Sequence, residues 1–484
     1  MRIPFLGRYG FRSERRLRWF CLLLAALVAL APEVSAGAGA PTSHIHARSI
    51  AVDSMGTGAT AKALRQRIVE RLQKHPGLRV AASPTEADVV LRGTSSVWPT
   101  GSYSISPHSN SYRVTNYAGY LSVELSDKSG QTLWSYLVTP SRFRSSSVTD
   151  NLADQAVSRL LDALHGIEAG AAPATISGAT ARAQLHAAGS TLAAPLYMKW
   201  FESAGIAVQY DADGSEAGLQ ELAEGKIDFA ASDMPPSGET HVTAIPTVAG
   251  GVVPIYNVPG VQGDLRFTPA VLAGIYSGAI TKWNDPRLRA INGGAHLPEA
   301  GITVVHRSDG SGTTFVWTSY LSQVSSSWKT SVGTGARVEW PVGVSAVGNG
   351  GLAETVQKTP NSIGYVELIF AIHNQLNFGA VENAAGRFIK ADLSSITIAV
   401  EDGARSDEHG LSVLNSAKKD AYPISTFTWV VVPAQGLDGG KRSAIAELLK
   451  WMLTSGQKGC ASLGYAPLPA AVASKALSAV NAMK

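Results

Sequence analysis

Cysteine is scarce in this sequence, and long apolar runs are missing after the N-terminus. Two cysteines occur in 484 residues, and Cys21 lies in a segment that we predict to be removed. The mature chain would keep Cys460 alone, which excludes an intramolecular disulfide, and a chain of this length can depend on its hydrophobic cores instead. No apolar run after residue 36 approaches the roughly 20 residues of a membrane span. We therefore expect a soluble mature protein.

The N-terminus has the pattern of an export signal. Six arginines precede the apolar run at residues 19–31, and residues 34–36 supply small side chains for cleavage. The run is too short to span a membrane comfortably. Cys21 follows bulky and basic residues, whereas a lipoprotein signal has small and aliphatic ones there, so we predict no lipid anchor. Residues 1–36 are predicted to be a signal peptide.

The mature chain also lacks an excess of positive charge. The formal net charge is +4, and residues 1–36 hold six arginines and two glutamates, a net of +4. Removal of the signal brings the net charge close to zero. Nucleic-acid binding loses its main electrostatic support, and we predict no nucleic-acid partner.

Motifs for nucleotide binding and for catalysis are missing around the most conspicuous glycine-serine stretch. Residues 306–314 read HRSDGSGTT, without the G-K-[ST] ending of a P-loop or the spacing of G-x-G-x-x-G. Ser311 is not in a G-x-S-x-G elbow. A hydrolase with Ser311 as nucleophile remains an alternative, but only His306 lies near it, without a triad or a metal cluster. We predict no enzyme activity and no cofactor.

Residues 44–166 have the pattern of a small α+β domain in the order βαβββα. Strands are predicted near residues 50–52, 87–93, 117–125 and 132–138, and helices near 61–74 and 150–164. His44 and His46 form an H-x-H pair without further candidate ligands, which predicts no metal site. Nothing in the pattern indicates a partner for this domain. Residues 167–184, rich in Ala, Gly, Ser and Thr, are predicted to be a linker.

A strand, a glycine-serine turn and a helix follow one another three times after residue 184. The turns are Gly189-Ser190-Thr191, Gly214-Ser215 and Ser311-Gly312-Thr313. Glycine and serine before a helix often serve only as turn and cap. In open α/β sheets, however, helix N-termini converge at the carboxyl ends of strands, where free N–H groups suit an anion. Three such turns indicate an anion site.

Three charged residues refine this prediction. Arg307 offers a rigid fork of donors that Asp309 can hold in place. Asp233 follows a buried strand and would repel an anion, unless that anion carries a proton. Hydrogen phosphate can donate a hydrogen bond from its O–H to a buried carboxylate, and sulfate cannot. A site of this kind can favour phosphate over sulfate by a factor on the order of 10⁴ or more. The sequence therefore predicts a site for phosphate that rejects sulfate.

Seven stretches occur together in one order between residues 185 and 484. They are AGSTLAAP (188–195), DFAASD (228–233), ITKWNDP (280–286), HRSDGSGTTF (306–315), WPVG (340–343), NSIGYV (361–366) and LGYAPLP (463–469). This combination resembles the periplasmic phosphate-binding proteins of bacterial phosphate ABC importers.

The resemblance implies an α/β fold of two lobes joined by two hinge crossings, with phosphate in the cleft. From the apolar runs suited to the crossings, lobe one is expected at residues 185–253 and 427–484, and lobe two at 254–426. The mature protein would be periplasmic and would deliver phosphate to a permease and ATPase complex. The implied phosphate ligands are Thr191, Leu192, Ser215, Asp233, Arg307, Ser311, Gly312 and Thr313, with Asp309 restraining Arg307.

The sequence departs from the family pattern at three places. Asp213 and Glu216 flank the second turn, where the family is richer in glycine and serine; these acids either point outward or weaken anion binding. Leu192 replaces a common aromatic residue, but its backbone N–H would serve equally. The domain at residues 44–166 is an addition to the pattern. It leaves a second function open, that of a phosphate sensor or scavenger docked to an envelope partner through this domain.

Overall fold

The computed structural model describes most of the chain after residue 43. The described residues are 43–44, 47–104, 113–139, 148–166, 168–169, 184–235, 241–261, 263–401, 405–407 and 410–483. The predicted signal peptide, His46 and most of the predicted linker lie outside these ranges. Among the described helices, none combines the length and the apolar character needed to cross a bilayer.

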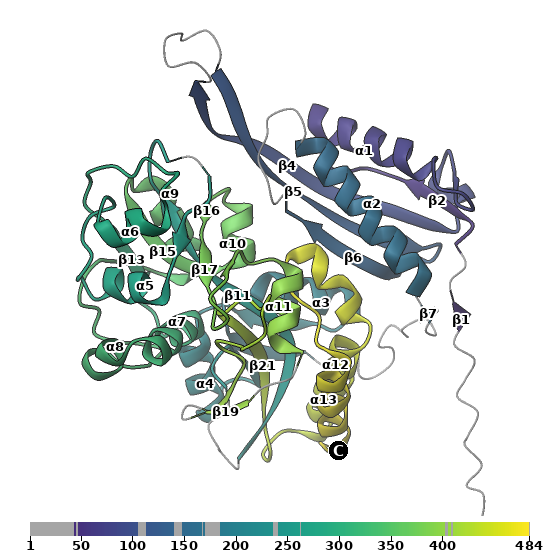
Figure 1. The fold of residues 1–484 in the computed structure, drawn as a ribbon. Coiled ribbons are helices and arrows are strands. Elements are labelled where there is room, and N and C mark those ends of the chain that lie inside the picture. Colours follow the sequence, from purple (N-terminus) through teal and green to yellow (C-terminus); the bar gives the residue numbers. More distant parts are fainter. Residues whose placement is uncertain are drawn as a thin grey trace, which may run out of the picture. The chain divides into compact units, whose positions relative to one another are not determined.

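The first described domain is a five-stranded sheet in the order β3-β2-β4-β5-β6, on which two helices pack side by side (Figure 1). Its elements are β2 (Ser49–Val52), α1 (Gly58–Leu72), β3 (Arg79–Val80), η1 (Pro84–Glu86), β4 (Val89–Ser104), β5 (Arg113–Asp127), β6 (Thr132–Val138) and α2 (Val148–Gly166). Leu64, Ile68 and Leu72 form the buried stripe of α1, as the helical spacing predicted.

Two details of this domain differ from the predicted order βαβββα. The two-residue strand β3 was missed, because it is too short to show any periodicity. The strand predicted at residues 87–93 runs on to Ser104, paired with β5 along its length. Serine and threonine fill much of this extension, so the backbone ladder, and not an apolar alternation, defines it. A further two-stranded pair joins β1 (Ser43–His44) to β7 (Glu168–Ala169).

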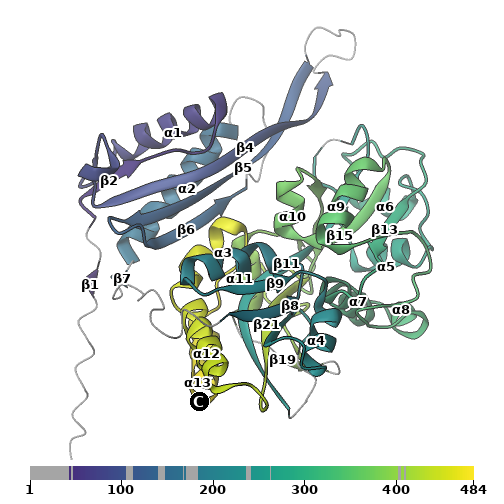
Figure 2. The same ribbon diagram turned by 180° about the vertical axis from the view of Figure 1, so that it is seen from behind.

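Residues 185–483 are built on a nine-stranded sheet (Figure 2). The strand order is β14-β13-β15-β11-β21-β10-β8-β9, with β16 also paired to β11. The strands are β8 (Leu185–Gly189), β9 (Val208–Asp211), β10 (Phe229–Ser232), β11 (Val242–Asn257), β13 (Thr303–Arg307), β14 (Val344–Ala346), β15 (Ser362–Glu367), β16 (Asn377–Phe378) and β21 (Ser425–Pro433).

Helices and short hairpins surround this sheet. The helices are α3 (Ala194–Ala204), α4 (Ser215–Ala223), α5 (Pro269–Tyr276), α6 (Pro286–Ile291), α7 (Gly312–Val324), α8 (Ser326–Ser331), α9 (Gly348–Lys358), α10 (Leu368–His373), α11 (Leu393–Val400), α12 (Gly439–Leu453) and α13 (Ala470–Ala482). The remaining elements are β12 (Arg266–Phe267), β17 (Ala380–Glu382), β18 (Phe388–Ile389), β19 (Arg405–Asp407), β20 (Gly410–Ser412), η3 (Gly456–Gly459) and η4 (Ala461–Leu463).

The long strand β11 changes partners part-way along its length. Residues 242–251 of β11 pair with β21, whereas residues 252–257 pair with β15. The sheet is thereby divided into two halves that share this strand. We call the half with β8, β9, β10 and β21 lobe one, and the half with β13, β14 and β15 lobe two.

Strand direction places several helix starts at the cleft between the lobes. In lobe one, β10 runs parallel to β8, and β8 to β9; in lobe two, β13 runs parallel to β14 and β15. Carboxyl ends of parallel strands share one edge of the sheet. The two edges meet where the backbone N–H of Glu216 donates to the carbonyl of Gly310, at 3.1 Å. The lobes are therefore in contact, with α3 and α4 on one side and α7 and α9 on the other.

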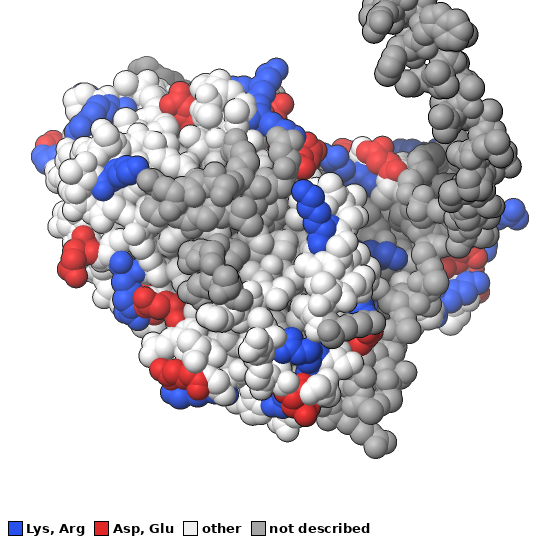
Figure 3. Space-filling model, turned by 90° about the horizontal axis from the view of Figure 1, so that it is seen from below, with Lys and Arg blue, Asp and Glu red and all other residues white. Residues whose placement is uncertain are grey.

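Charge on the molecular surface is mixed. Figure 3 shows lysine and arginine interspersed with aspartate and glutamate on the face it displays. Exposed ion pairs such as Lys282–Glu299 and Lys358–Glu354 contribute to this mixture. On this face, charges of one sign do not gather into a large patch.

Candidate functional site

A buried carboxylate lies at the lobe-one side of the cleft. Asp233 follows β10 and is 1% exposed. Ser190 Oγ lies 2.8 Å from each of its carboxylate oxygens, and Thr428 Oγ1 donates to Oδ1 at 2.7 Å. Ser215 Oγ makes a longer contact of 3.4 Å to Oδ2. Hydroxyl groups thus surround this acid, each from a different element of lobe one.

Burial raises the pKa of Asp233 to about 6, although the hydroxyls of Thr428 and Ser190 and the charge of Arg307 act to lower it. Desolvation penalises the ionised form of a buried acid, and hydrogen bonds to that form offset the penalty in part. Near neutral pH the carboxylate is therefore ionised, and it favours a neighbour that donates a hydrogen bond.

The start of α7 lies directly against this acid from the other lobe. A Cβ atom added to Gly312 would lie 2.3 Å from Ser215 Oγ and 2.7 Å from Asp233 Oδ2. Such contacts are sterically forbidden, so glycine is required at this position for close approach of the two lobes. Gly312 of lobe two and Ser215 and Asp233 of lobe one form a single site.

Arg307 is held rigidly at the end of β13. Its side chain is 1% exposed; Nε donates to Asp309 Oδ1 at 2.7 Å and Nη2 pairs with Asp309 Oδ2. Gly348 N also donates to Asp309 Oδ1, at 3.1 Å. Burial acts to raise the pKa of Asp309, but the hydrogen bonds and charge of Arg307 outweigh it and hold this pKa below its ordinary value. Asp309 therefore stays ionised and fixes the orientation of the guanidinium.

One donor of this guanidinium is unused. Arg307 Nη1 is buried without a hydrogen-bond partner among the described residues. A buried, charged N–H group without an acceptor is costly, because its desolvation is not compensated. An oxyanion in the cleft would supply that acceptor.

The N-terminus of α7 adds further donors. Ser311 caps the helix by accepting a hydrogen bond from Thr314 N at 3.1 Å, which leaves its own hydroxyl proton free to donate. The N–H groups of Gly312 and Thr313, at the first two helical positions, have no carbonyl in a preceding turn to bond. The partial positive charge of the helix start also favours an anion here.

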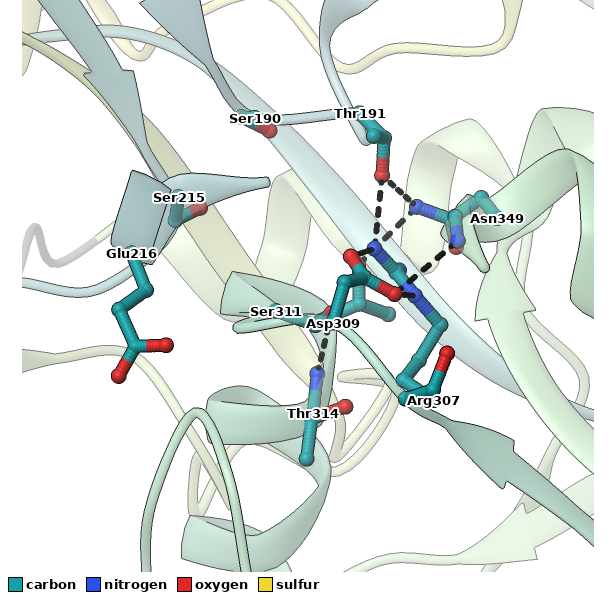
Figure 4. Close-up of polar contacts among 12 residues, drawn as sticks. Ser190, Thr191, Ser215, Glu216, Arg307, Asp309, Ser311, Thr314 and Asn349 are labelled. Atoms are coloured by element: carbon teal, nitrogen blue, oxygen red, sulfur yellow. Dashed lines mark hydrogen bonds and ion pairs between the residues drawn. The ribbon is translucent and has the colours of Figure 1, made fainter. Parts of the chain in front are cut away.

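The first turn, Gly189-Ser190-Thr191, leads into α3 as predicted. The helix begins at Ala194, with Pro195 in its first turn, a position where proline is favoured because its fixed φ suits the helix. Leu192 N, expected to face the ligand, donates to Ser190 Oγ at 3.1 Å. The Thr191 hydroxyl points toward Arg307 and Asn349 (Figure 4) and lies 3.4 Å from Arg307 Nη2.

Two site residues were missed by the sequence analysis. Thr428 lies on β21 and bonds Asp233; Asn349, at the second position of α9, bonds Thr191 and Thr313. Both lie far along the chain from the residues they contact. The only sequence signal was the polar character of these two residues in their surroundings. Thr428 lies in a largely apolar strand, and Asn349 stands between two glycines at the start of a helix.

One of the two extra acids beside the second turn does not face the site. Glu216 points away from Arg307 and Asn349 in Figure 4, and its carboxylate pairs with Arg337. Asp213 is exposed. Of the two alternatives raised by the sequence, the outward orientation is the one observed for Glu216.

The histidine nearest to Ser311 in the sequence is engaged elsewhere. Nδ1 of His306 lies 3.2 Å from the carbonyl of Arg307, and the His306 ring stacks on Trp340 at 5.0 Å. No group of three or more His, Cys, Asp or Glu side chains within the described ranges is placed to hold a metal ion. The arrangement combines many donors with one acceptor, which suits the binding of a protonated oxyanion.

Comparison with known proteins shows the family of this chain. Residues 174–455 match the family model described as a PBP superfamily domain. The phosphate-binding protein PstS of Xylella fastidiosa (strain Temecula1) is 38% identical over 301 residues, covering 60% of this chain and 83% of that protein. The chain belongs to the PstS family. PstS of Pasteurella multocida is 37% identical over 299 residues, covering 60% of this chain and 87% of its own.

A solved structure shares the fold of this chain. The crystal structure of an ancestral soluble variant of the human phosphate-binding protein has a TM-score of 0.50 at 19% identity, covering 60% of this chain and 93% of its own. At this identity the likeness concerns the fold alone. The two-lobed α/β periplasmic binding protein fold expected from the sequence is confirmed by the sheet described above and by the family match.

Proposed function

We propose that this PstS-family protein binds inorganic phosphate in the cleft between its lobes and delivers it to an ABC import permease. The main support for the proposal is that the site contains one buried hydrogen-bond acceptor, Asp233, and one buried donor that has no acceptor among the described residues, Arg307 Nη1. Asp233 accepts hydrogen bonds at the lobe-one side, and at the lobe-two side Arg307 Nη1 is a donor that has no partner in the described part of the chain. A protonated tetrahedral oxyanion satisfies both groups at once.

In this proposal the phosphate receives donors from both lobes. Thr191 and Ser215 contribute from lobe one, with the backbone of Leu192 released from Ser190 when the anion is bound. Arg307 and the start of α7 at Ser311, Gly312 and Thr313 contribute from lobe two. Each charge-assisted hydrogen bond contributes about 1.5–3 kcal/mol, and Asp233 accepts the hydrogen bond of the phosphate O–H. Asp309 does not touch the ligand and restrains Arg307.

The protein would act in the periplasm without turning phosphate over. The relatives named above are phosphate-binding proteins, and the export pattern at residues 1–36 supports secretion before binding. Domain boundaries at residues 44–166 and 185–484, with a linker between them, form part of the same proposal. The permease and its ATPase would be the partners that receive the ligand from the closed protein.

Equilibrium dialysis with radiolabelled phosphate, competed by sulfate or arsenate, tests the binding role. We expect saturable phosphate binding that sulfate does not compete. Cells lacking this protein should lose high-affinity phosphate uptake and regain it with the wild-type gene. Release of phosphate from a phosphomonoester without added metal would support the enzyme alternative instead.

A second function deserves a test because the chain carries an additional domain. The family model begins at residue 174, whereas the five-stranded sheet ends with β6 and is followed by α2, which ends at Gly166. A sensor or scavenger would use this domain to dock to an envelope partner. Cross-linking of the full chain in cells, followed by identification of what is captured, distinguishes the two roles: the permease supports transport, and a different envelope protein supports sensing.

A further inference from the structure

Asn349 connects three parts of the site through one side chain. It is fully buried and lies at the second position of α9. Its Nδ2 lies 2.9 Å from Thr191 Oγ1 and 3.1 Å from Thr313 Oγ1. Its Oδ1 accepts a hydrogen bond from Glu367 N at 3.1 Å. The amide therefore contacts a lobe-one hydroxyl, a lobe-two hydroxyl and the end of β15.

The orientation of this amide follows from its neighbours. A backbone N–H can only donate, so the Asn349 atom that faces Glu367 N must be the oxygen. The nitrogen then faces the two threonines, and its two hydrogens account for the two contacts. Both threonine oxygens are consequently acceptors toward Asn349.

The groups that donate to each threonine hydroxyl determine the direction in which that hydroxyl can itself donate. Thr191 Oγ1 accepts from Asn349 Nδ2 and, over 3.4 Å, from Arg307 Nη2, which occupies both of its lone pairs. Its remaining capacity is to donate. Thr313 Oγ1 also accepts from Asn349, so its own proton is free to be donated elsewhere. Each hydroxyl becomes a donor available to an anion in the cleft.

We propose that Asn349 is a positioning residue of the phosphate site, which sets the Thr191 and Thr313 hydroxyls as donors toward the anion and links the two lobes around it. This inference rests on the proposed function, because it concerns the same cleft and ligand. Without the amide, each hydroxyl can rotate and turn a lone pair toward the phosphate. That arrangement is repulsive, since two acceptors then face each other.

A double-mutant cycle separates positioning from simple structural support. Asn349→Ala is titrated with inorganic phosphate in three backgrounds: wild type, Thr191→Val with Thr313→Val, and Thr191→Ser with Thr313→Ser. We expect Asn349→Ala to weaken binding by about 10–100-fold in the wild-type background, the size of one or two hydrogen bonds. It should weaken binding by less than about threefold in the valine background, where no hydroxyl remains to orient. In the serine background, which keeps both hydroxyls, Asn349→Ala should again weaken phosphate binding by as much as in the wild-type background.

A matched control addresses loss of structure. Asn383 is another buried asparagine, whose Nδ2 donates to the carbonyls of Lys419 and Ala421, both at 3.0 Å, outside the site. Asn383→Ala should lower the melting temperature and leave the phosphate Kd unchanged. If the valine pair binds too weakly to titrate, the single valine variants complete the cycle with the same expected loss of coupling.

The outcomes distinguish this inference from the proposed function. If the wild-type protein does not bind phosphate, both are wrong. If the wild type binds and Asn349→Ala binds equally well, or loses the same factor in the valine and wild-type backgrounds, the positioning role alone is wrong. The positioning role is supported if Asn349→Ala weakens phosphate binding in the wild-type and serine backgrounds but not in the valine background.

Discussion

Arg337 and Glu216 form an ion pair across the cleft between the two lobes. Arg337 Nε donates to Glu216 Oε2, and Arg337 Nη1 donates to the carbonyl of Ser308 at 2.9 Å. Glu216 stands in the first turn of α4 in lobe one, and Arg337 lies between α8 and β14 in lobe two. The contact can exist only while the lobes are together. The acid that departs from the family pattern thus becomes part of the closed conformation.

Arg337→Gln should weaken phosphate binding slightly and in a salt-dependent way. The two side chains are 60% and 43% exposed, and exposed pairs contribute about 0.2–1 kcal/mol, which corresponds to at most about a fivefold change in Kd. The change should shrink between about 0.01 M and about 1 M salt as screening increases. Calorimetry at both salt concentrations measures it. Lys282→Gln, which removes an exposed pair within lobe two, should have no effect on Kd, and equal effects of the two variants would contradict a closing role.

Asp233→Asn should relax the rejection of sulfate. The amide can donate a hydrogen bond to an unprotonated anion oxygen, whereas the carboxylate repels it. We expect the ratio of sulfate Kd to phosphate Kd to fall by about 100-fold or more. Asp228→Asn is the matched control, since Asp228 is also buried but bonds His186 N and Lys441 Nζ outside the site. Unchanged selectivity in Asp233→Asn would show that this acid does not recognise the phosphate proton.

The pKa of Asp233 predicts a pH dependence of stability in the unliganded protein. Burial raises this pKa to about 6, above its ordinary value of 3.8, so the folded state binds more protons than the unfolded state between these values. Asp233 therefore adds about 3 kcal/mol to the free energy of unfolding below about pH 4, and this contribution is lost as the pH rises through about 6. Melting temperatures of wild type and Asp233→Asn across this range measure it. A constant difference between the two proteins would contradict the prediction.

The same titration should affect selectivity. Below about pH 6 Asp233 becomes protonated and can itself donate a hydrogen bond to sulfate. We expect measurable sulfate binding to appear as the pH falls from 8 to 5 in wild type, and to be independent of pH in Asp233→Asn. Competition dialysis with labelled sulfate measures this. Sulfate binding that stays absent at pH 5 would be contrary to the expectation.

Arg307→Ala should weaken the binding of phosphate and arsenate alike, because it removes a positive charge that would contact either oxyanion. Loss of one charge-assisted hydrogen bond of about 1.5–3 kcal/mol predicts a 10–100-fold higher Kd. Arg287→Ala is the control: Arg287 pairs with Asp285 two residues away, through Nε at 2.9 Å and Nη2 at 2.8 Å, but on the surface. A phosphate Kd unchanged by Arg307→Ala would remove the guanidinium from the site.

The sequence was sufficient to predict the local parts of this site. Ser190, Ser215 and Ser311 could be placed at strand-to-helix turns because glycine spacing and apolar periodicity are local signals. Asp233 could be placed at the end of a strand because the short apolar run before it indicates a buried strand. The family resemblance then supplied the two-lobed fold.

The sequence was insufficient wherever a contact joins distant segments. Asn349 and Thr428 reach the site through the packing of α9 and β21, which no local spacing encodes. The engagement of Leu192 N by Ser190 Oγ depends on the conformation of the turn that precedes α3, which the residue pattern does not specify. The outward orientation of Glu216 depends on Arg337, more than a hundred residues away along the chain.

In the proposed site, the buried carboxylate of Asp233 recognises the proton of a tetrahedral anion that donors of both lobes hold. A calorimetric titration of the mature wild-type protein near neutral pH, with phosphate in one experiment and sulfate in the other, tests this recognition most directly. We expect one tightly bound phosphate per chain and no heat of binding with sulfate. Equal binding of the two anions, or binding of neither, would contradict it.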